Sequence, residues 1–108
     1  MTKISIIGTG NVAWHLSRFF ENADLEIEYI YSRNIYDAKE FSESLFGGKY
    51  TDSLDFGKAE SSLYFLCVSD DAIADISYKI IVPPGATLIH TSGAKSIDEI
   101  AKIIELRD

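Results

Sequence analysis

The sequence is poor in cysteine and in long apolar runs, and each shortage excludes a class of protein. Cys67 is the single cysteine, so an intramolecular disulfide or a metal site built on several cysteines is impossible. No apolar run approaches the ~18 residues that span a membrane, and residues 1–7 are too short for a secretory signal. We therefore expect a soluble, cytoplasmic protein.

Basic side chains are also scarce. Ten Lys and Arg residues stand against 17 Asp and Glu, which gives a net charge of −7, and the basic residues form no block. A nucleic-acid surface is therefore not expected, and any anionic ligand must be held by local donors. The two histidines, His15 and His90, do not stand at metal-ligand spacing, so no metal site is predicted.

The 108 residues suit one domain, in which apolar strands alternate with amphipathic helices. The pattern predicts strands over 3–7, 25–31, 49–51, 63–68 and 87–90, and helices over 10–22, 34–46, 69–79 and 96–106. The segment 54–59 is typical of a turn or a short helix. The buried face of the first helix is predicted to hold Val12, Ala13, Leu16, Phe19 and Phe20. Strands separated by helices imply right-handed crossovers. We therefore predict an α/β fold of three layers, with a doubly wound parallel sheet of strand order 3-2-1-4-5.

Residues 3–13 contain the clearest signal of function: an apolar strand, then Gly8-x-Gly10-x-x-Ala13, then the start of a helix. This is the pattern of a dinucleotide-binding turn. Gly8 allows a sharp turn out of the strand, the missing Cβ of Gly10 lets a pyrophosphate approach the backbone, and Ala13 keeps the helix close to the sheet. The anion would sit on free N–H groups at the positive end of the helix.

The end of the second predicted strand indicates which dinucleotide would bind. An NAD site has an Asp or Glu about 20 residues beyond the glycines, which accepts hydrogen bonds from the ribose 2′-hydroxyl. Here the sequence is Ser32-Arg33-Asn34. Arg33 offers a bidentate, charge-assisted contact to a 2′-phosphate, and its neighbours add neutral donors. The pattern favours NADP(H) over NAD(H); the alternative is that Arg33 is a solvated surface residue.

Four segments together resemble successive motifs of one family. They are Gly8-Thr9-Gly10-Asn11-Val12-Ala13, Tyr31-Ser32-Arg33, Cys67-Val68-Ser69-Asp70-Asp71-Ala72-Ile73 and His90-Thr91-Ser92-Gly93-Ala94. The family comprises Rossmann-like NADP oxidoreductases related to pyrroline-5-carboxylate reductase. The resemblance implies a Rossmann-like domain over residues 1–108 that binds NADP(H), with the later loops beside the ribose and nicotinamide. The implied cofactor-binding residues are Gly8, Thr9, Gly10, Asn11, Val12, Ser32, Arg33, Asn34, Val68, Ser69, Asp70, Thr91 and Ser92.

This chain is shorter than members of that family. Their nucleotide domain is followed by a helical domain of unknown function, which supports dimerisation and closes the substrate site. We therefore expect that the chain represents the nucleotide-binding domain alone and lacks a complete substrate site. A homodimer would then form mainly through the absent helical domain, and an uncovered apolar patch is expected on the crevice side.

Several polar residues at the predicted strand ends have two readings. His90 could be a general acid or a substrate ligand, or its imidazole could bond local backbone. Thr91 and Ser92 could contact the nicotinamide amide or stabilise a turn. Asp70 and Asp71 are explained most simply as first-turn residues that stabilise a helix. The catalytic residue is therefore unknown, with His90 as a weak candidate.

Two functions follow from these observations. The first is the NADP(H)-binding domain of an oxidoreductase that transfers hydride to or from a small carbonyl or imine compound. The particular substrate is not indicated by the sequence. The second is a non-enzymatic nucleotide-binding or regulatory module that uses the same turn and signals through a partner.

Overall fold

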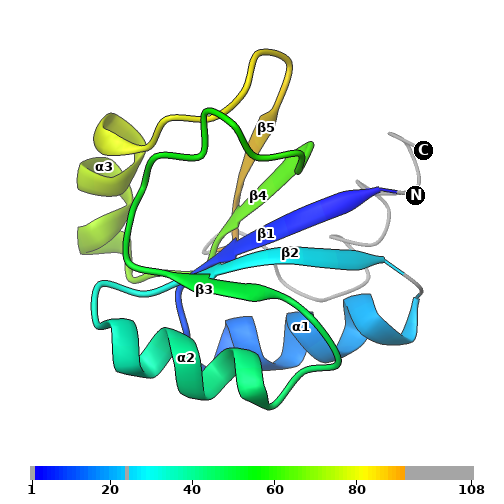
Figure 1. Ribbon diagram of the computed structural model, residues 1–108. Helices are drawn as coiled ribbons and strands as arrows, with labels where there is room; N and C mark the ends of the chain where they lie inside the picture. The colour runs from blue at the N-terminus through cyan, green and yellow to red at the C-terminus, as the bar shows by residue number, and fades with distance from the viewer. Residues whose placement is uncertain (1, 24, 92–108) are drawn as a thin grey trace.

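The computed structural model describes residues 2–23 and 25–91, which form five strands and three helices in alternation (Figure 1). In chain order these are β1 (Lys3–Ile7), α1 (Asn11–Asn22), β2 (Glu26–Tyr31), α2 (Ile35–Glu43), β3 (Lys49–Thr51), β4 (Leu63–Leu66), α3 (Asp70–Lys79) and β5 (Thr87–His90). The helix predicted over 96–106 lies outside the described residues.

The five strands form one parallel sheet of order β3-β2-β1-β4-β5. This confirms the predicted order. The chain runs outward from β1 to β3, then crosses back to β4 on the other side of β1. The order of the strands therefore reverses between β1 and β4, where the loops at the carboxyl ends of the two strands diverge.

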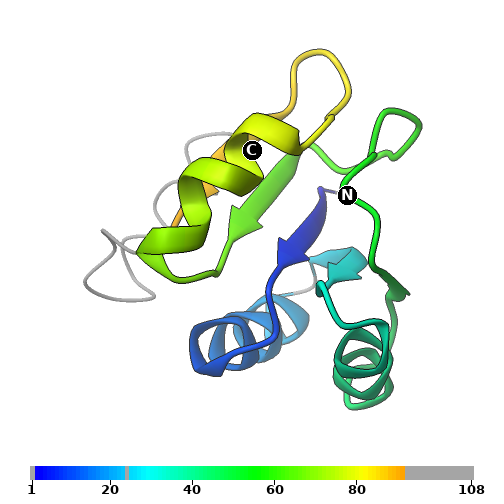
Figure 2. The ribbon, with the colours of Figure 1, turned by 90° about the vertical axis from the view of Figure 1, so that its left-hand side faces the viewer.

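Helices cover both faces of the sheet, so the domain has three layers. α1 and α2 lie on one face and α3 lies on the other (Figure 1 and Figure 2). One apolar cluster joins α1 and α2 to the sheet, with Phe20 and Phe41 as its large helical residues. A second cluster holds Ile76 of α3 together with Tyr64 and the loop residue Phe56. Residues along β1 alternate between the clusters, because successive side chains of a strand point to opposite faces.

The buried face of α1 agrees with the sequence pattern except at its first turn. Ala13, Leu16 and Phe20 are buried, as predicted, but Val12 is 51% exposed. Val12 lies on the same helical stripe as Leu16 and Phe20, one turn closer to the start of the helix. Ala13 in the same turn is fully buried in the core, so Val12 lies beside it at the edge of the buried face.

The strand predicted over 63–68 and the helix predicted over 34–46 both end earlier in the structure. β4 ends at Leu66 rather than Val68. α2 ends at Glu43 rather than near residue 46. The Ser44 hydroxyl donates to the Phe41 carbonyl. The Phe46 N–H donates to Glu21 Oε2 at 2.7 Å, and not to a helical carbonyl. The segment 54–59 is a turn, and it forms an isolated parallel bridge from Asp55 to Ile81.

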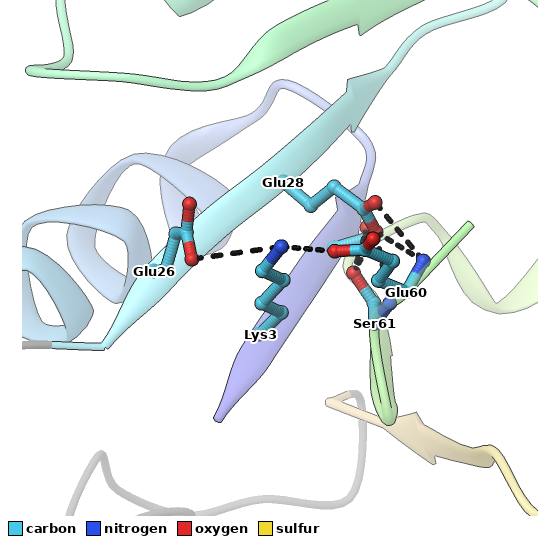
Figure 3. A network of polar contacts seen from close by, with 6 residues as sticks. Lys3, Glu26, Glu28, Glu60 and Ser61 are labelled. Atoms are coloured by element: carbon cyan, nitrogen blue, oxygen red, sulfur yellow. Dashed lines mark hydrogen bonds and ion pairs between the residues drawn. The ribbon is translucent and has the colours of Figure 1, made fainter. Parts of the chain in front are cut away.

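A bulge in β2 creates a polar network that the sequence did not predict (Figure 3). The register of β1 against β2 shifts at this point, and Glu28 is the extra residue. Its carboxylate accepts hydrogen bonds from the backbone N–H groups of Glu60 and Ser61, at 3.0 and 2.9 Å. Lys3 forms ion pairs with Glu60 and, at 3.9 Å, with Glu26. The network fastens the start of β4 to β2 across β1.

Candidate functional site

The candidate site lies at the carboxyl ends of the parallel strands. Because all five strands run in one direction, the loops that follow them emerge at one edge of the sheet. Open parallel sheets bind ligands outside this edge, where the strand order reverses. The segments predicted to contact a cofactor, residues 8–12, 32–34, 68–70 and 91, follow β1, β2, β4 and β5 respectively.

Gly8 makes the turn out of β1 and is irreplaceable on steric grounds. Its φ is +121°, a value that side chains rarely adopt, and a Cβ built on it would lie 2.2 Å from the carbonyl oxygen of Cys67. The Gly8 N–H donates to the Tyr31 carbonyl at 2.8 Å, and the Cys67 N–H donates to the Ile7 carbonyl at 2.8 Å. The turn is therefore fixed to the strands on both sides of β1.

Gly10 presents a different case, because nothing among the described residues requires a glycine there. Its φ is −82°, and a Cβ would meet no atom within 4 Å. Gly10 is the N-cap of α1, and the first helical hydrogen bond joins the Trp14 N–H to the Gly10 carbonyl at 2.9 Å. The N–H groups of residues 11–13 precede that bond and have no helical acceptor. The glycine therefore keeps a set of backbone donors open.

This arrangement fits an anion. The cap of α1 makes no side-chain hydrogen bond, and the first turn of the helix contains no acidic residue. The positive end of the helix dipole is thus unopposed by local charge. We name the N–H groups of residues 10–13, together with the open space above Gly10, the amide cradle.

The loop after β2 presents hydrogen-bond donors to solvent. Ser32 Oγ accepts from the Asn34 N–H at 3.2 Å, and Asn34 Oδ1 accepts from the Tyr36 N–H at 2.9 Å as the N-cap of α2. These bonds occupy acceptor atoms and leave the Ser32 hydroxyl hydrogen and the Asn34 amide hydrogens free. Arg33 is exposed and has no hydrogen bond or ion pair within the described residues. We name residues 32–34 the donor loop.

The loop after β4 packs against the glycine turn. Val68 is half-buried, and its Cγ1 would lie 3.3 Å from a Cβ on Gly8. Ser69 is the N-cap of α3, as predicted, but its side chain makes no capping bond; its carbonyl accepts from the Ala72 N–H at 2.9 Å. Asp70 and Asp71 are exposed in the first turn, where a carboxylate stabilises a helix.

At the end of β5 the structure separates two predicted residues. His90 is exposed, with no hydrogen bond or ion pair in the described part of the chain. Thr91 is buried, and its hydroxyl donates to the Leu66 carbonyl at 3.0 Å. Burial raises the pKa of the neighbouring Cys67 thiol to about 12, and a hydrogen bond with Thr91 offsets this in part. Ser92 lies outside the described residues.

The loop after β3 also lies at this edge, although none of its residues was predicted to belong to the site. Asp52 directly follows β3, and the Ser32 N–H donates to the carbonyl of the preceding Thr51 at 3.1 Å. The carboxylate of Asp52 therefore stands at the same edge as the donor loop, on the side away from β1. The position of Asp52 could have been predicted from the sequence, because strand 49–51 and its place next to the second strand were both predicted.

A hollow of about 440 Å³ opens between α1 and α2 below the glycine turn. Its lining residues are Thr9, Trp14, Asp37, Glu40, Phe41 and Ser44. The carboxylates of Asp37 and Glu40 disfavour a phosphate there, so this hollow is not an extension of the amide cradle.

Metal and membrane functions find no support in the described part of the chain. Between residues 2 and 91, Asp24 apart, no group of three His, Cys, Asp or Glu side chains could hold a metal ion. Over the same residues, no helix has the length and apolar character needed to cross a membrane.

Comparison with known proteins finds solved structures of similar fold whose names describe oxidoreductases. A protein from Bacteroides fragilis, provisionally named an NADP oxidoreductase, is 28% identical with a TM-score of 0.75, over 86% of this chain and 37% of that one. Prephenate dehydrogenase from A. aeolicus, in complex with hydroxyphenyl propionate and NAD⁺, is 17% identical with a TM-score of 0.69, over 84% and 33%. A reductive aminase from Aspergillus terreus, in complex with NADPH, is 20% identical with a TM-score of 0.63, over 95% and 37%.

These similarities establish a Rossmann-type fold for this chain. No protein-family model and no curated protein matches it. The chain spans about a third of the length of the three solved structures, which are oxidoreductases by name. What those proteins bind and transform is a property of much longer chains.

Proposed function

We propose that this chain is the NADP(H)-binding domain of an oxidoreductase that transfers hydride to or from a small carbonyl or imine substrate. The observation that carries the proposal is the pairing of the amide cradle with the donor loop at one edge of the sheet. A pyrophosphate needs the first, and a ribose 2′-phosphate needs the second. The solved structures with bound NADPH or NAD⁺ support the proposal through their shared fold.

The residues present fit this cofactor in three ways. The space above Gly10 leaves room for the pyrophosphate, and the free N–H groups of residues 11–13 would donate to it. Arg33 carries no competing ion pair within the described residues. The donor loop contains no carboxylate, which a ribose diol would need as its acceptor. When bound, the nicotinamide would supply the hydride chemistry.

The chain's own residues would bind and orient the cofactor. The turn at Gly8 holds the cradle at the point where the strand order reverses. The loops after β4 and β5 would then lie on the nicotinamide side. His90 is an exposed side chain at the end of β5 that could move a proton at its imidazole. A substrate site would also need residues beyond those described.

Calorimetric titration of the 108-residue protein with NADPH and NADH tests the proposal. We expect tighter binding of NADPH. Arg33→Ala should weaken NADPH by roughly 1.5–3 kcal/mol, the contribution of a hydrogen bond to a charged group, and should leave NADH nearly unchanged. Lys58→Ala removes one exposed positive charge outside the donor loop and serves as the control.

Three results would contradict this assignment. Equal affinities for the two dinucleotides would reject the role of Arg33, and no binding of either would reject the cofactor. An equal loss in Lys58→Ala would show that net charge, rather than the donor loop, determines affinity.

A further inference from the structure

Asp52 has a carboxylate that the fold does not use. It is exposed, and it has no hydrogen bond or ion pair with any described residue. The side-chain oxygens of nearby residues accept hydrogen bonds from backbone N–H groups of the same loop. Thr51 Oγ1 accepts from the Ser53 N–H at 3.0 Å, and Asp55 Oδ1 accepts from the Gly57 N–H at 3.0 Å. Asp52 is thus the free acceptor at the end of β3.

The sheet fixes where this acceptor lies relative to the proposed site. Tyr31 pairs with Thr51 in register, and Ser32 donates to the Thr51 carbonyl, so Asp52 follows immediately alongside the donor loop. Adjacent strands lie ~4.8 Å apart. The amide cradle after β1, the donor loop after β2 and Asp52 after β3 therefore form a row along the edge, each about one strand spacing from the next.

A dinucleotide laid along this row would bring its base to Asp52. The pyrophosphate at the cradle and the phosphorylated ribose at the donor loop fix a direction, and the base is the next group in that direction. On the basis of the proposed function, we propose that Asp52 recognises the base, its carboxylate accepting a hydrogen bond from the exocyclic amino group of adenine.

The chemistry of the carboxylate gives this contact its selectivity. An ionised carboxylate only accepts hydrogen bonds. The 6-amino group of adenine donates to it, whereas a 6-oxo base presents an oxygen at that position and has its nearest donor at N1–H instead. Asp52, if it faces the 6-position, therefore favours a 6-aminopurine dinucleotide over its 6-oxo counterpart, whose oxygen repels the carboxylate.

Binding calorimetry with NADPH and with its deaminated analogue, nicotinamide hypoxanthine dinucleotide phosphate, tests the contact. The two ligands differ at the 6-position of the base, which bears an amino group in one and an oxygen in the other, and at N1, which carries a hydrogen only in the 6-oxo base. We expect the unaltered protein to bind NADPH about tenfold more tightly, which corresponds to ~1.4 kcal/mol. In Asp52→Asn the amide can either donate or accept, so the ratio of the two affinities should fall toward one. Asp52→Ala should remove the preference as well.

A matched control separates local contact from charge. Glu43→Gln neutralises another exposed carboxylate, at the far end of α2, and should keep the tenfold ratio. Loss of any negative charge relieves repulsion from the phosphates of both ligands alike, so this effect cancels in the ratio. Thermal unfolding of each variant confirms that the exposed substitutions leave the fold intact.

The possible outcomes separate a failure of the proposed role of Asp52 from a failure of the proposed cofactor binding. If neither dinucleotide binds, the proposed function fails and the role of Asp52 fails with it. If NADPH binds but the two affinities are equal, or Asp52→Asn leaves their ratio unchanged, only the role of Asp52 is overturned. If Asp52→Asn weakens NADH and spares the base ratio, Asp52 accepts from the ribose hydroxyls instead, and base recognition is wrong.

Discussion

Replacing Gly8 and Gly10 separately by alanine should separate the folding of the glycine turn from its capacity to bind a phosphate. The two glycines stand two residues apart but have opposite surroundings. A Cβ on Gly8 would lie 2.2 Å from a backbone oxygen of Cys67, with φ at +121°, whereas a Cβ on Gly10 would meet no atom within 4 Å. The sequence pattern alone gives both residues the same importance.

The expected loss of stability in Gly8→Ala has two sources, the strained φ and the clash with the Cys67 carbonyl oxygen. A strained φ costs about 1–3 kcal/mol, and overpacking against a neighbour that cannot move away costs about 1–3 kcal/mol more. The Cys67 carbonyl is part of the backbone beside Gly8, so it has little freedom to yield. The sum is a large share of the roughly 5–15 kcal/mol that stabilises a domain. The melting temperature should fall by at least roughly 10 °C.

Gly10→Ala should behave in the reverse way. Alanine is a poorer N-cap than glycine by about 0.5–1 kcal/mol, and the loss of freedom in the unfolded chain offsets a similar amount. Stability should therefore change by less than about 1 kcal/mol. NADPH affinity should fall at least about tenfold, because the methyl group would fill the space above the free N–H groups.

Thermal and urea unfolding followed by circular dichroism, together with NADPH calorimetry, measure both effects. Gly47→Ala is the control, since a Cβ there meets nothing within 4 Å and the residue lies away from the site. A melting temperature for Gly8→Ala within a few degrees of the unaltered protein would refute the steric argument. Unchanged NADPH binding in Gly10→Ala would refute the amide cradle.

Three further predictions concern parts of the fold outside the site. Burial raises the pKa of the Cys67 thiol to about 12. This thiol should therefore react with iodoacetamide at pH 8 far more slowly than a free cysteine, and should recover its reactivity in urea. Fast labelling of the native protein would show that the thiol is accessible to solvent. Glu28→Ala should lower the free energy of unfolding by about 2 kcal/mol, because the Glu60 and Ser61 N–H groups lose a charged acceptor, and an unchanged urea midpoint would contradict that. Lys3 holds the pKa of the Glu60 carboxyl below its usual 4.5, so the small stability from this exposed pair is present above that pH and is lost as the pH falls below it.

The strand order was predictable because it depends on short-range patterns. β1 and β4 are apolar runs bounded by a turn or a cap, and the alternation of strands with helices leaves few topologies. Asn34 shows the same principle at one residue. Its position before an amphipathic segment predicts an N-cap, and its Oδ1 accepts the Tyr36 N–H as expected.

The exposed and irregular positions were less predictable because they depend on distant partners. Val12 matches the apolar stripe of α1, but it is exposed because the neighbouring Ala13 is the residue of that turn that packs into the core. The last part of the predicted second helix is diverted by the carboxylate of Glu21, which accepts the Phe46 N–H from 25 residues away. Periodicity within a helix has no access to such contacts.

The candidate site divides in the same way. The roles of Gly8 and Gly10 follow from a local pattern, so their place in the turn was foreseen. From the sequence, Thr91 was predicted either to contact the nicotinamide amide or to stabilise a turn. Its bond to the Leu66 carbonyl could not be predicted, because it depends on the pairing of β4 with β5. Asp52 carries no motif at all, and its interest comes from its place beside the donor loop.

The attachment of the glycine turn to both neighbouring strands has a consequence for the energetics of binding. The backbone at Ile7 and Gly8 is held by hydrogen bonds to β4 and β2 before any ligand arrives. Little conformational entropy remains to be lost at this point, so the turn is preorganised. A phosphate should therefore dock without an ordering step, and the Gly8 amide should exchange its hydrogen only when the sheet itself opens.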